Sequence, residues 1–379
     1  MMQSQLSNED NLRLNVLLNQ EVHSIRIDEG KMLLHGLTDK GEAKIKLSPN
    51  CRNDAYIRRV KEMISSHVLG SPGGYPVYIK RWTRMGHARD NSLENLLKLG
   101  EPEAVVAVVH SKGLTDELAR RAWWAMASAE NARRMLEKQA VAEGAMGRTL
   151  AEFLLEFLPF EEQARDIIDS VRLVLQPELI NEQERESLWS KGQRKSVYKV
   201  GFMLAIPDEL PEPVAAHPDW EQTKTELTGL IEQNNQHATQ LERVLSSAGQ
   251  TFINTVETVL KKPSNQDAVV MSLEAIRQYF SDLRLPGEAC RDMASIEQQI
   301  EQTCQPDQTN APETLSALLT SNPEQADYIK AMMKLASVGV DVVNPIFAQT
   351  DAIGNVMRRK LEPVIAPILE QCKILKAGR

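Results

Sequence analysis

From Asn91 onward the chain is broken at short, fairly regular intervals by glycine, proline and helix-capping residues, and each interval has the apolar spacing of a helix. The clearest breaks are Gly100, Pro102, Gly113, Thr115, Ser128, Gly144 and Pro159. Helices this short are marginally stable alone, so each must bury its apolar stripe against its neighbours. These regularly spaced breaks therefore predict a packed array of short helices, each antiparallel to the one before it.

This array is expected to cover residues 91–206. One apolar stripe within it contains Leu150, Phe153, Leu154, Phe157 and Leu158, and a second contains Ile167, Ile168, Val171 and Leu175. The sequence has no strict period, so we predict an irregular, HEAT-like array and no named repeat.

The first ninety residues have a different pattern. Segments 22–28, 31–37 and 42–47 are short, rich in apolar residues and separated by turn residues, and the last alternates apolar and polar residues from Ala43 to Leu47. A period of two is typical of a strand with one buried face. We therefore predict a small antiparallel meander.

Two helices are expected to accompany this meander. The first places Leu12 and Val16 on one face, with Leu17 as a further candidate. The second begins near Asp54, and Gly70 follows it as a stop signal. Its apolar face contains Ile57, Val60, Ile64 and Val68. The alternating segment 75–82 then predicts an edge strand.

Beyond residue 206 the pattern changes again. Segment 207–219 contains four prolines and predicts a linker. From Leu227 to Phe252 apolar residues alternate steps of three and four, which predicts a long helix, or a hairpin of two helices broken at Gly249. Asn234 occupies one position of this heptad seam, where it would set the register of a helix pair.

The expected fold class is therefore mainly α. Its predicted domains are a small N-terminal α/β head (1–90), the HEAT-like array (91–206), the Pro-rich linker (207–219) and a helical C-terminal domain (220–379).

Composition excludes several classes of protein. Apolar residues make up 42% of the 379-residue chain, but no apolar run approaches the roughly 20 residues of a membrane helix. The first twenty residues lack the basic start and apolar middle of a signal peptide. We expect a cytoplasmic protein with no membrane partner.

Metal and catalytic signatures are also missing from the sequence. Cys51, Cys290, Cys304 and Cys372 are far apart, and no histidines have a ligand spacing. No nucleophile, base and orienting acid occur at a recognisable spacing. We therefore predict no metal, no cofactor and no catalytic residue.

The main candidate contact surface is basic. Residues 52–89 have eight basic and two acidic side chains, a net charge of +6 in a chain of net charge −8. The candidate residues are Arg58, Arg59, Lys61, Lys80, Arg81, Trp82, Arg84 and Arg89. They could contact the phosphates and bases of a nucleic acid, or pair with the acidic helices of the protein itself.

Two further features have structural interpretations. Gly73 and Gly74 lack the Gly-Lys-Ser/Thr of a phosphate-binding loop and are expected to form a turn. Trp123 and Trp124 are adjacent, so they face about 100° apart on a helix: one is expected in the array core and the other in a groove between helices. An aromatic anchor for a partner is the alternative.

Several segments of the sequence resemble those of the DsrS family. They are "HVLGSPGGYPVYIKRWTRMG", "LLKLGEPEAVVAVVH", "GLTDELARRAWWAM", "NARRMLE", "AEFLLEFLPFE" and "VRLVLQPELI", and the resemblance covers residues 11–206. The family accompanies the dissimilatory sulfite reductase genes of sulfur-oxidising bacteria. The resemblance implies a soluble, cytoplasmic accessory or regulatory protein of sulfur oxidation without established catalytic residues.

Three function hypotheses remain open. The first is a non-catalytic accessory protein that acts through protein–protein contacts with the sulfur-oxidation machinery. The second is a nucleic-acid-binding, post-transcriptional regulator that uses segment 52–89. An enzyme of unknown type is the weakest hypothesis, and the oligomeric state is open.

Overall fold

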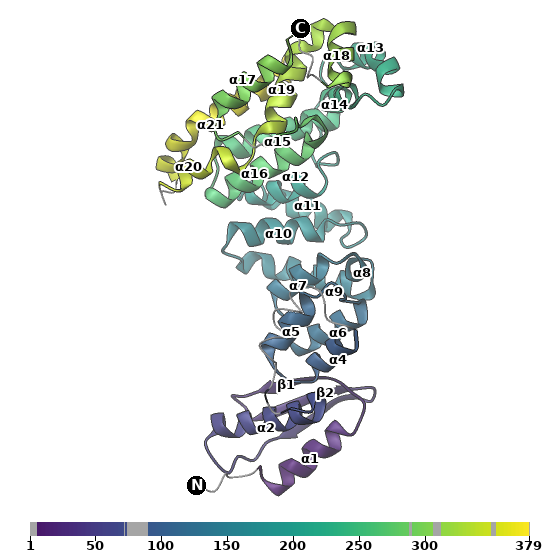
Figure 1. The fold of residues 1–379 in the computed structure, drawn as a ribbon, viewed down its shortest axis with the longest axis vertical. Coiled ribbons are helices and arrows are strands. Elements are labelled where there is room, and N and C mark those ends of the chain that lie inside the picture. The colour runs from purple at the N-terminus through teal and green to yellow at the C-terminus, as the bar shows by residue number, and fades with distance from the viewer. Residues whose placement is uncertain are drawn as a thin grey trace. The chain divides into compact units, whose positions relative to one another are not determined.

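The computed structural model describes residues 6–71, 73, 90–287, 290–305, 312–349 and 354–378. It is mainly helical, with a small α/β head at the N-terminal end, as the sequence predicts (Figure 1). The chain divides into two compact units, unit 1 (Met1–Phe157) and unit 2 (Leu158–Arg379). The division falls inside segment 91–206, so the limits of the compact units differ from the predicted domain limits.

The head contains the predicted meander. Strands β1 (Val22–Asp28), β2 (Leu33–Thr38) and β3 (Gly41–Lys46) form one antiparallel sheet in the order β1-β2-β3. Leu34 pairs with Ile45, and both are buried. The period-two prediction is confirmed.

Helices α1 (Asn8–Leu18) and α2 (Asn53–Leu69) pack with this sheet around one apolar cluster. As predicted, Gly70 ends α2, with a φ of 71° that glycine adopts readily. Gly36 lets α1 approach the sheet closely, because a Cβ there would lie 3.0 Å from Cδ1 of Leu17.

The predicted apolar face of α1 is wrong in part. Leu14, Leu17 and Leu18 are buried, whereas Leu12 is 67% and Val16 is 53% exposed. The sequence offers two apolar faces on this helix, and the three leucines at positions i, i+3 and i+4 form the larger one. That face packs in the cluster.

The sheet also supports the helices that follow it in unit 1. Oγ of Ser24 donates a hydrogen bond to the carbonyl of Leu97 at 3.2 Å, and Nη1 of Arg26 donates one to the carbonyl of Trp124 at 3.1 Å. The helices are α4 (Asp90–Leu97), α5 (Pro102–Val109), α6 (Asp116–Ala125), α7 (Ala129–Leu136), α8 (Gln139–Ala142) and α9 (Ala145–Phe157). Thr115 and Ser128 cap α6 and α7 with their side chains.

Unit 2 continues with short helices. They are α10 (Ala164–Val174), α11 (Glu182–Lys191), α12 (Val197–Ala205), α13 (Trp220–Glu232), α14 (Gln236–Leu245), α15 (Ser247–Lys261), α16 (Gln266–Tyr279), α17 (Met293–Thr303), α18 (Glu313–Ser321), α19 (Ala326–Ser337), α20 (Asn344–Phe347) and α21 (Gly354–Ile374). Within the described ranges, no helix is long and apolar enough to cross a membrane.

The Pro-rich segment 207–219 is packed within unit 2. Leu210 and His217 are buried, and the backbone N–H of His217 donates to the carbonyl of Leu245 at 2.8 Å. The backbone N–H of Val214 donates to Oγ1 of Thr251 at 3.0 Å. Proline lacks only its own donor, so the other residues of this segment can still bind their neighbours.

The heptad pattern does not produce one long helix. Helix α13 ends at Glu232, and Asn234 is exposed with a φ of 58°. Asparagine tolerates this left-handed conformation, which breaks the helix. Asn235 then caps α14, and Ser246 caps α15 close to the predicted break at Gly249. The prediction that Asn234 sets a helix register is wrong.

Candidate functional site

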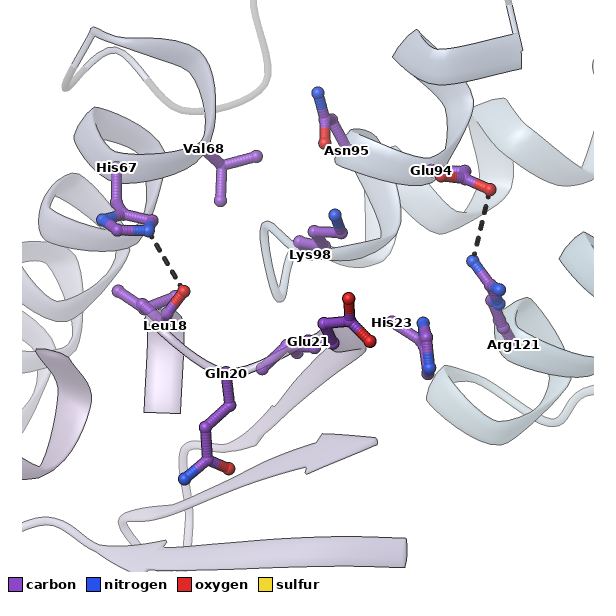
Figure 2. Close-up of a pocket in the computed structure, with 11 residues that line it drawn as sticks. Leu18, Gln20, Glu21, His23, His67, Val68, Glu94, Asn95, Lys98 and Arg121 are labelled. Atoms are coloured by element: carbon purple, nitrogen blue, oxygen red, sulfur yellow. Dashed lines mark hydrogen bonds and ion pairs between the residues drawn. The ribbon is translucent and has the colours of Figure 1, made fainter. Parts of the chain in front are cut away.

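A polar cleft lies inside unit 1 (Figure 2). Its volume is about 510 Å³. The end of α1, the start of β1, the end of α2 and parts of α4 and α6 supply its walls. The lining residues are Leu18, Gln20, Glu21, Val22, His23, His67, Val68, Glu94, Asn95, Lys98 and Arg121.

One wall is fixed by the ends of two head helices. Nε2 of His67, near the end of α2, donates a hydrogen bond to the carbonyl of Leu18 at 3.1 Å. That carbonyl is in the last turn of α1, where no intrahelical donor is available. The bond therefore satisfies the end of α1 and holds α2 beside it.

The other wall is organised by Arg121 of α6. Its Nε donates to Oε1 of Glu117 at 2.7 Å, and its Nη1 donates to Oε1 of Glu94 on α4 at 3.4 Å. Hydrogen bonds from Arg120 and Arg121 lower the pKa of Glu117 to about 2. The carboxylate is thus charged at neutral pH and holds the guanidinium in place.

Both signs of charge occur in this cleft. In Figure 2, Glu21 and Lys98 lie between the wall that contains His67 and the wall that contains Arg121. His23 contacts Oδ1 of Asp39 at 2.6 Å, and this hydrogen bond is the main reason that the pKa of Asp39 is lowered. Such a cleft can bind a polar ligand through hydrogen bonds. In the ranges that the structure describes, no three His, Cys, Asp or Glu side chains gather as metal ligands.

The predicted basic residues of α2 do not line the cleft. Arg58 is exposed, Arg59 donates to Sγ of Cys51 at 3.5 Å, and Nζ of Lys61 pairs with Glu29 at 2.7 Å. Lys61 thus pairs with an acidic side chain of the head itself, in the turn after β1, and not with one of the acidic helices expected from the sequence.

The rest of the predicted basic surface lies outside the described residues. It consists of Lys80, Arg81, Trp82, Arg84 and Arg89, and Gly74 and the predicted edge strand fall in the same part of the chain. These remain predictions.

The two adjacent tryptophans have different partners within unit 1. The ring of Trp123 packs edge-on against Phe153 of α9, with 4.8 Å between centroids. The guanidinium of Arg26 on β1 lies 4.6 Å above the ring of Trp124. Trp123 thus packs between helices, whereas Trp124 packs on the sheet, and both are half-buried.

The residues that line the cleft were not predicted from the sequence. Glu21 and His23 share one segment at the start of β1, His67, Lys98 and Arg121 come from three others, and each alone resembles an ordinary surface residue. Only the sheet and its packed helices bring them together, so no local spacing could have identified them.

Comparison with known protein families, with curated proteins and with solved structures finds no match for this chain. Function is therefore inferred from the residues, the fold and the sequence resemblance.

Proposed function

We propose that this protein is a non-catalytic accessory or regulatory protein that acts through protein–protein contacts, one of them made by α1. The observation that supports this proposal most directly is the exposed apolar pair Leu12 and Val16 on that helix. The sequence resemblance to the DsrS family implies that the partners belong to the cytoplasmic sulfur-oxidation machinery.

The outer face of α1 has the chemistry of a protein interface. Leu12 and Val16 are four residues apart and therefore adjacent on the helix. Beside them, the side chain of Asn15 donates to the backbone of Asn11 at 2.9 Å, and that of Asn19 donates to the backbone of Asn15 at 2.8 Å. Interface cores combine apolar and uncharged polar groups and are depleted of charge.

The charges on this face neutralise each other. Arg13 pairs with Glu9 at 2.5 Å one turn away, so the face is uncharged overall although the chain has a net charge of −8. The partner that fits is a protein with an apolar groove that has a polar, uncharged rim. An amphipathic helix can bind in such a groove through its apolar face.

The nucleic-acid hypothesis has less support among the described cations. Lys61 pairs with Glu29, and Arg52 pairs with Asp54 at 3.1 Å. A nucleic-acid partner would bind through phosphates and would be released steeply by salt, whereas an apolar contact is little affected.

The test compares wild-type protein with the double variant Leu12→Asp/Val16→Asp. Partners are crosslinked in the producing cells, identified, purified and titrated against each protein at two salt concentrations. Because both side chains are exposed, the variant should fold normally and bind its partner about tenfold or more weakly. Val356→Asp changes an apolar side chain of similar exposure, 57%, on α21 and serves as the matched control.

Two results would contradict the proposal. One is a purified partner that binds the double variant as tightly as the wild type. The other is binding that disappears with moderate salt or on nuclease treatment, which would favour the nucleic-acid hypothesis.

A further inference from the structure

A second cavity lies entirely within unit 2 and has a volume of about 460 Å³. The loop between α11 and α12 forms one side, and the starts of α10 and α16 and the end of α15 form the others. Neither the sequence patterns nor the proposed function uses this cavity.

Its charge is opposite to that of the whole chain. Arg194, Lys195, Lys199 and Lys262 line it, against the single carboxylate of Glu162. In the part of the chain that the structure describes, none of these four cations forms an ion pair. Their combined positive potential is therefore available to an anion in the cavity.

Two helix starts add partial positive charge. Helix α12 follows Ser196, and α10 follows Gln163, and neither residue caps its helix with its side chain. The first-turn N–H groups of a helix, together with its dipole, favour an anion at that end. Helix α16 differs, because Asn265 already accepts a bond from Ala268.

Lys199 is the independent observation that points to a ligand. It lines the cavity but is only 7% exposed, and within the described ranges its ammonium has no hydrogen-bond acceptor or carboxylate. Its Nζ lies 4.9 Å from the ring centroid of Trp189. The stem of this lysine is buried and its ammonium lines the cavity without a counterion, so an anion bound there would compensate the positive charge.

The backbone makes room for this lysine. A Cβ on Gly192 would lie 2.8 Å from Cγ of Lys199 and 2.9 Å from the carbonyl oxygen of Trp189. Glycine at this position lets the lysine stem pass between the loop and the tryptophan ring.

We propose that this cavity binds a phosphate group, either free or on a small organic molecule, with Lys199 as its buried cationic ligand. Several cations and two helix starts suit a multiply charged oxyanion. The volume lies in the usual range for small-molecule sites and exceeds what a bare phosphate needs. Ile167 and Val197 line it and provide apolar contact for an organic part.

To test this proposal, inorganic phosphate, ATP and adenosine are each titrated into the 379-residue protein in a phosphate-free buffer of low ionic strength. Thermal unfolding and calorimetry measure binding. We expect phosphate or ATP to bind and to raise the melting temperature, and adenosine to do neither. Tighter binding of ATP than of phosphate would assign the site to an organic phosphate, and equal affinities would assign it to free phosphate.

Lys199→Met should weaken the binding of phosphate or ATP by about tenfold or more, because it removes a charged ligand but keeps an unbranched side chain that can fill the space of the lysine stem. Its melting temperature without ligand should be equal to or above that of the wild type. Lys224→Met is the matched control, because Nζ of Lys224 also lies 4.9 Å from a tryptophan ring, that of Trp220, but the side chain is exposed and lines no described cavity.

Lys262→Met changes an exposed lysine of the same cavity and should weaken binding less than Lys199→Met. Absence of binding by both phosphate and ATP at millimolar concentration would overturn the proposal. Unchanged affinity in Lys199→Met would also overturn it, and a loss of basal stability in that variant without a change in affinity would assign Lys199 a structural role.

Discussion

Replacing Asn235 with alanine should destabilise unit 2 substantially. Asn235 is 4% exposed, and its Oδ1 accepts hydrogen bonds from the backbone N–H groups of His237 and Ala238, each at 3.1 Å. Its Nδ2 donates to the carbonyl of Thr314, next to the start of α18, at 2.7 Å. One side chain thus caps α14 and joins it to α18.

The size of the effect follows from these contacts. Loss of an N-cap costs about 1 kcal/mol. Loss of the buried hydrogen bond from Nδ2 to the carbonyl of Thr314 costs about 0.5–1.5 kcal/mol more, since that carbonyl lies within α18 and keeps its helical acceptor position. Asn235→Ala should therefore lower the free energy of unfolding by about 1.5–2.5 kcal/mol. Urea unfolding measures this as a lower midpoint with an unchanged slope.

The neighbouring asparagine provides a matched control. Asn234 is exposed and has a φ of 58°, which glycine adopts without strain, so Asn234→Gly should change stability by no more than about 0.5 kcal/mol. If residues 227–252 formed one continuous helix, Asn234→Gly would be the more destabilising of the two substitutions. Asn235→Ala would then be neutral or stabilising, and Asn234→Gly would cost about 1 kcal/mol. That reversed order would refute the reasoning.

Two further predictions concern buried polar groups. Tyr56→Phe removes the hydroxyl that donates to Oδ2 of the buried Asp10 at 2.5 Å, so the head should lose about 1–3 kcal/mol in urea unfolding, and an unchanged midpoint would contradict this role. Burial lowers the pKa of His237 from 6.5 to about 4, so the unfolded chain binds its proton more readily than the folded chain. The stability contributed by neutral His237 should be complete above pH 6.5 and decline as the pH falls toward 4. His237→Gln should remove this part of the pH dependence of the melting temperature, and identical pH profiles would show that another group is responsible.

The sequence predicts the meander and α2 of the head well because their signals are local. The alternation from Ala43 to Leu47 and the helical spacing from Ile57 to Ile64 each require one buried face, and the structure buries both. Helix α1 is less certain from sequence, because its two apolar faces compete and only the sheet selects the leucine face.

The structural role of a polar residue is harder to predict from the sequence, because one residue type suits several local structures. In a heptad, Asn234 resembles a buried register residue, but an Asn-Asn pair also suits a left-handed turn followed by a helix cap. The structure uses the pair in the second way. The cleft in unit 1 and the cavity around Lys199 depend on contacts between distant segments, which no spacing in the sequence records.

The packing of segment 207–219 has a consequence for how the chain can be divided in the laboratory. A fragment that begins at residue 220 would lack the buried Leu210 and His217 and would leave the carbonyl of Leu245 without its donor. A fragment that ends at residue 206 would lack α14 and α15, the helices to which segment 207–219 is hydrogen-bonded. Four prolines usually suggest a convenient place to cut, but here the segment is part of the core of unit 2, and a fragment boundary belongs elsewhere.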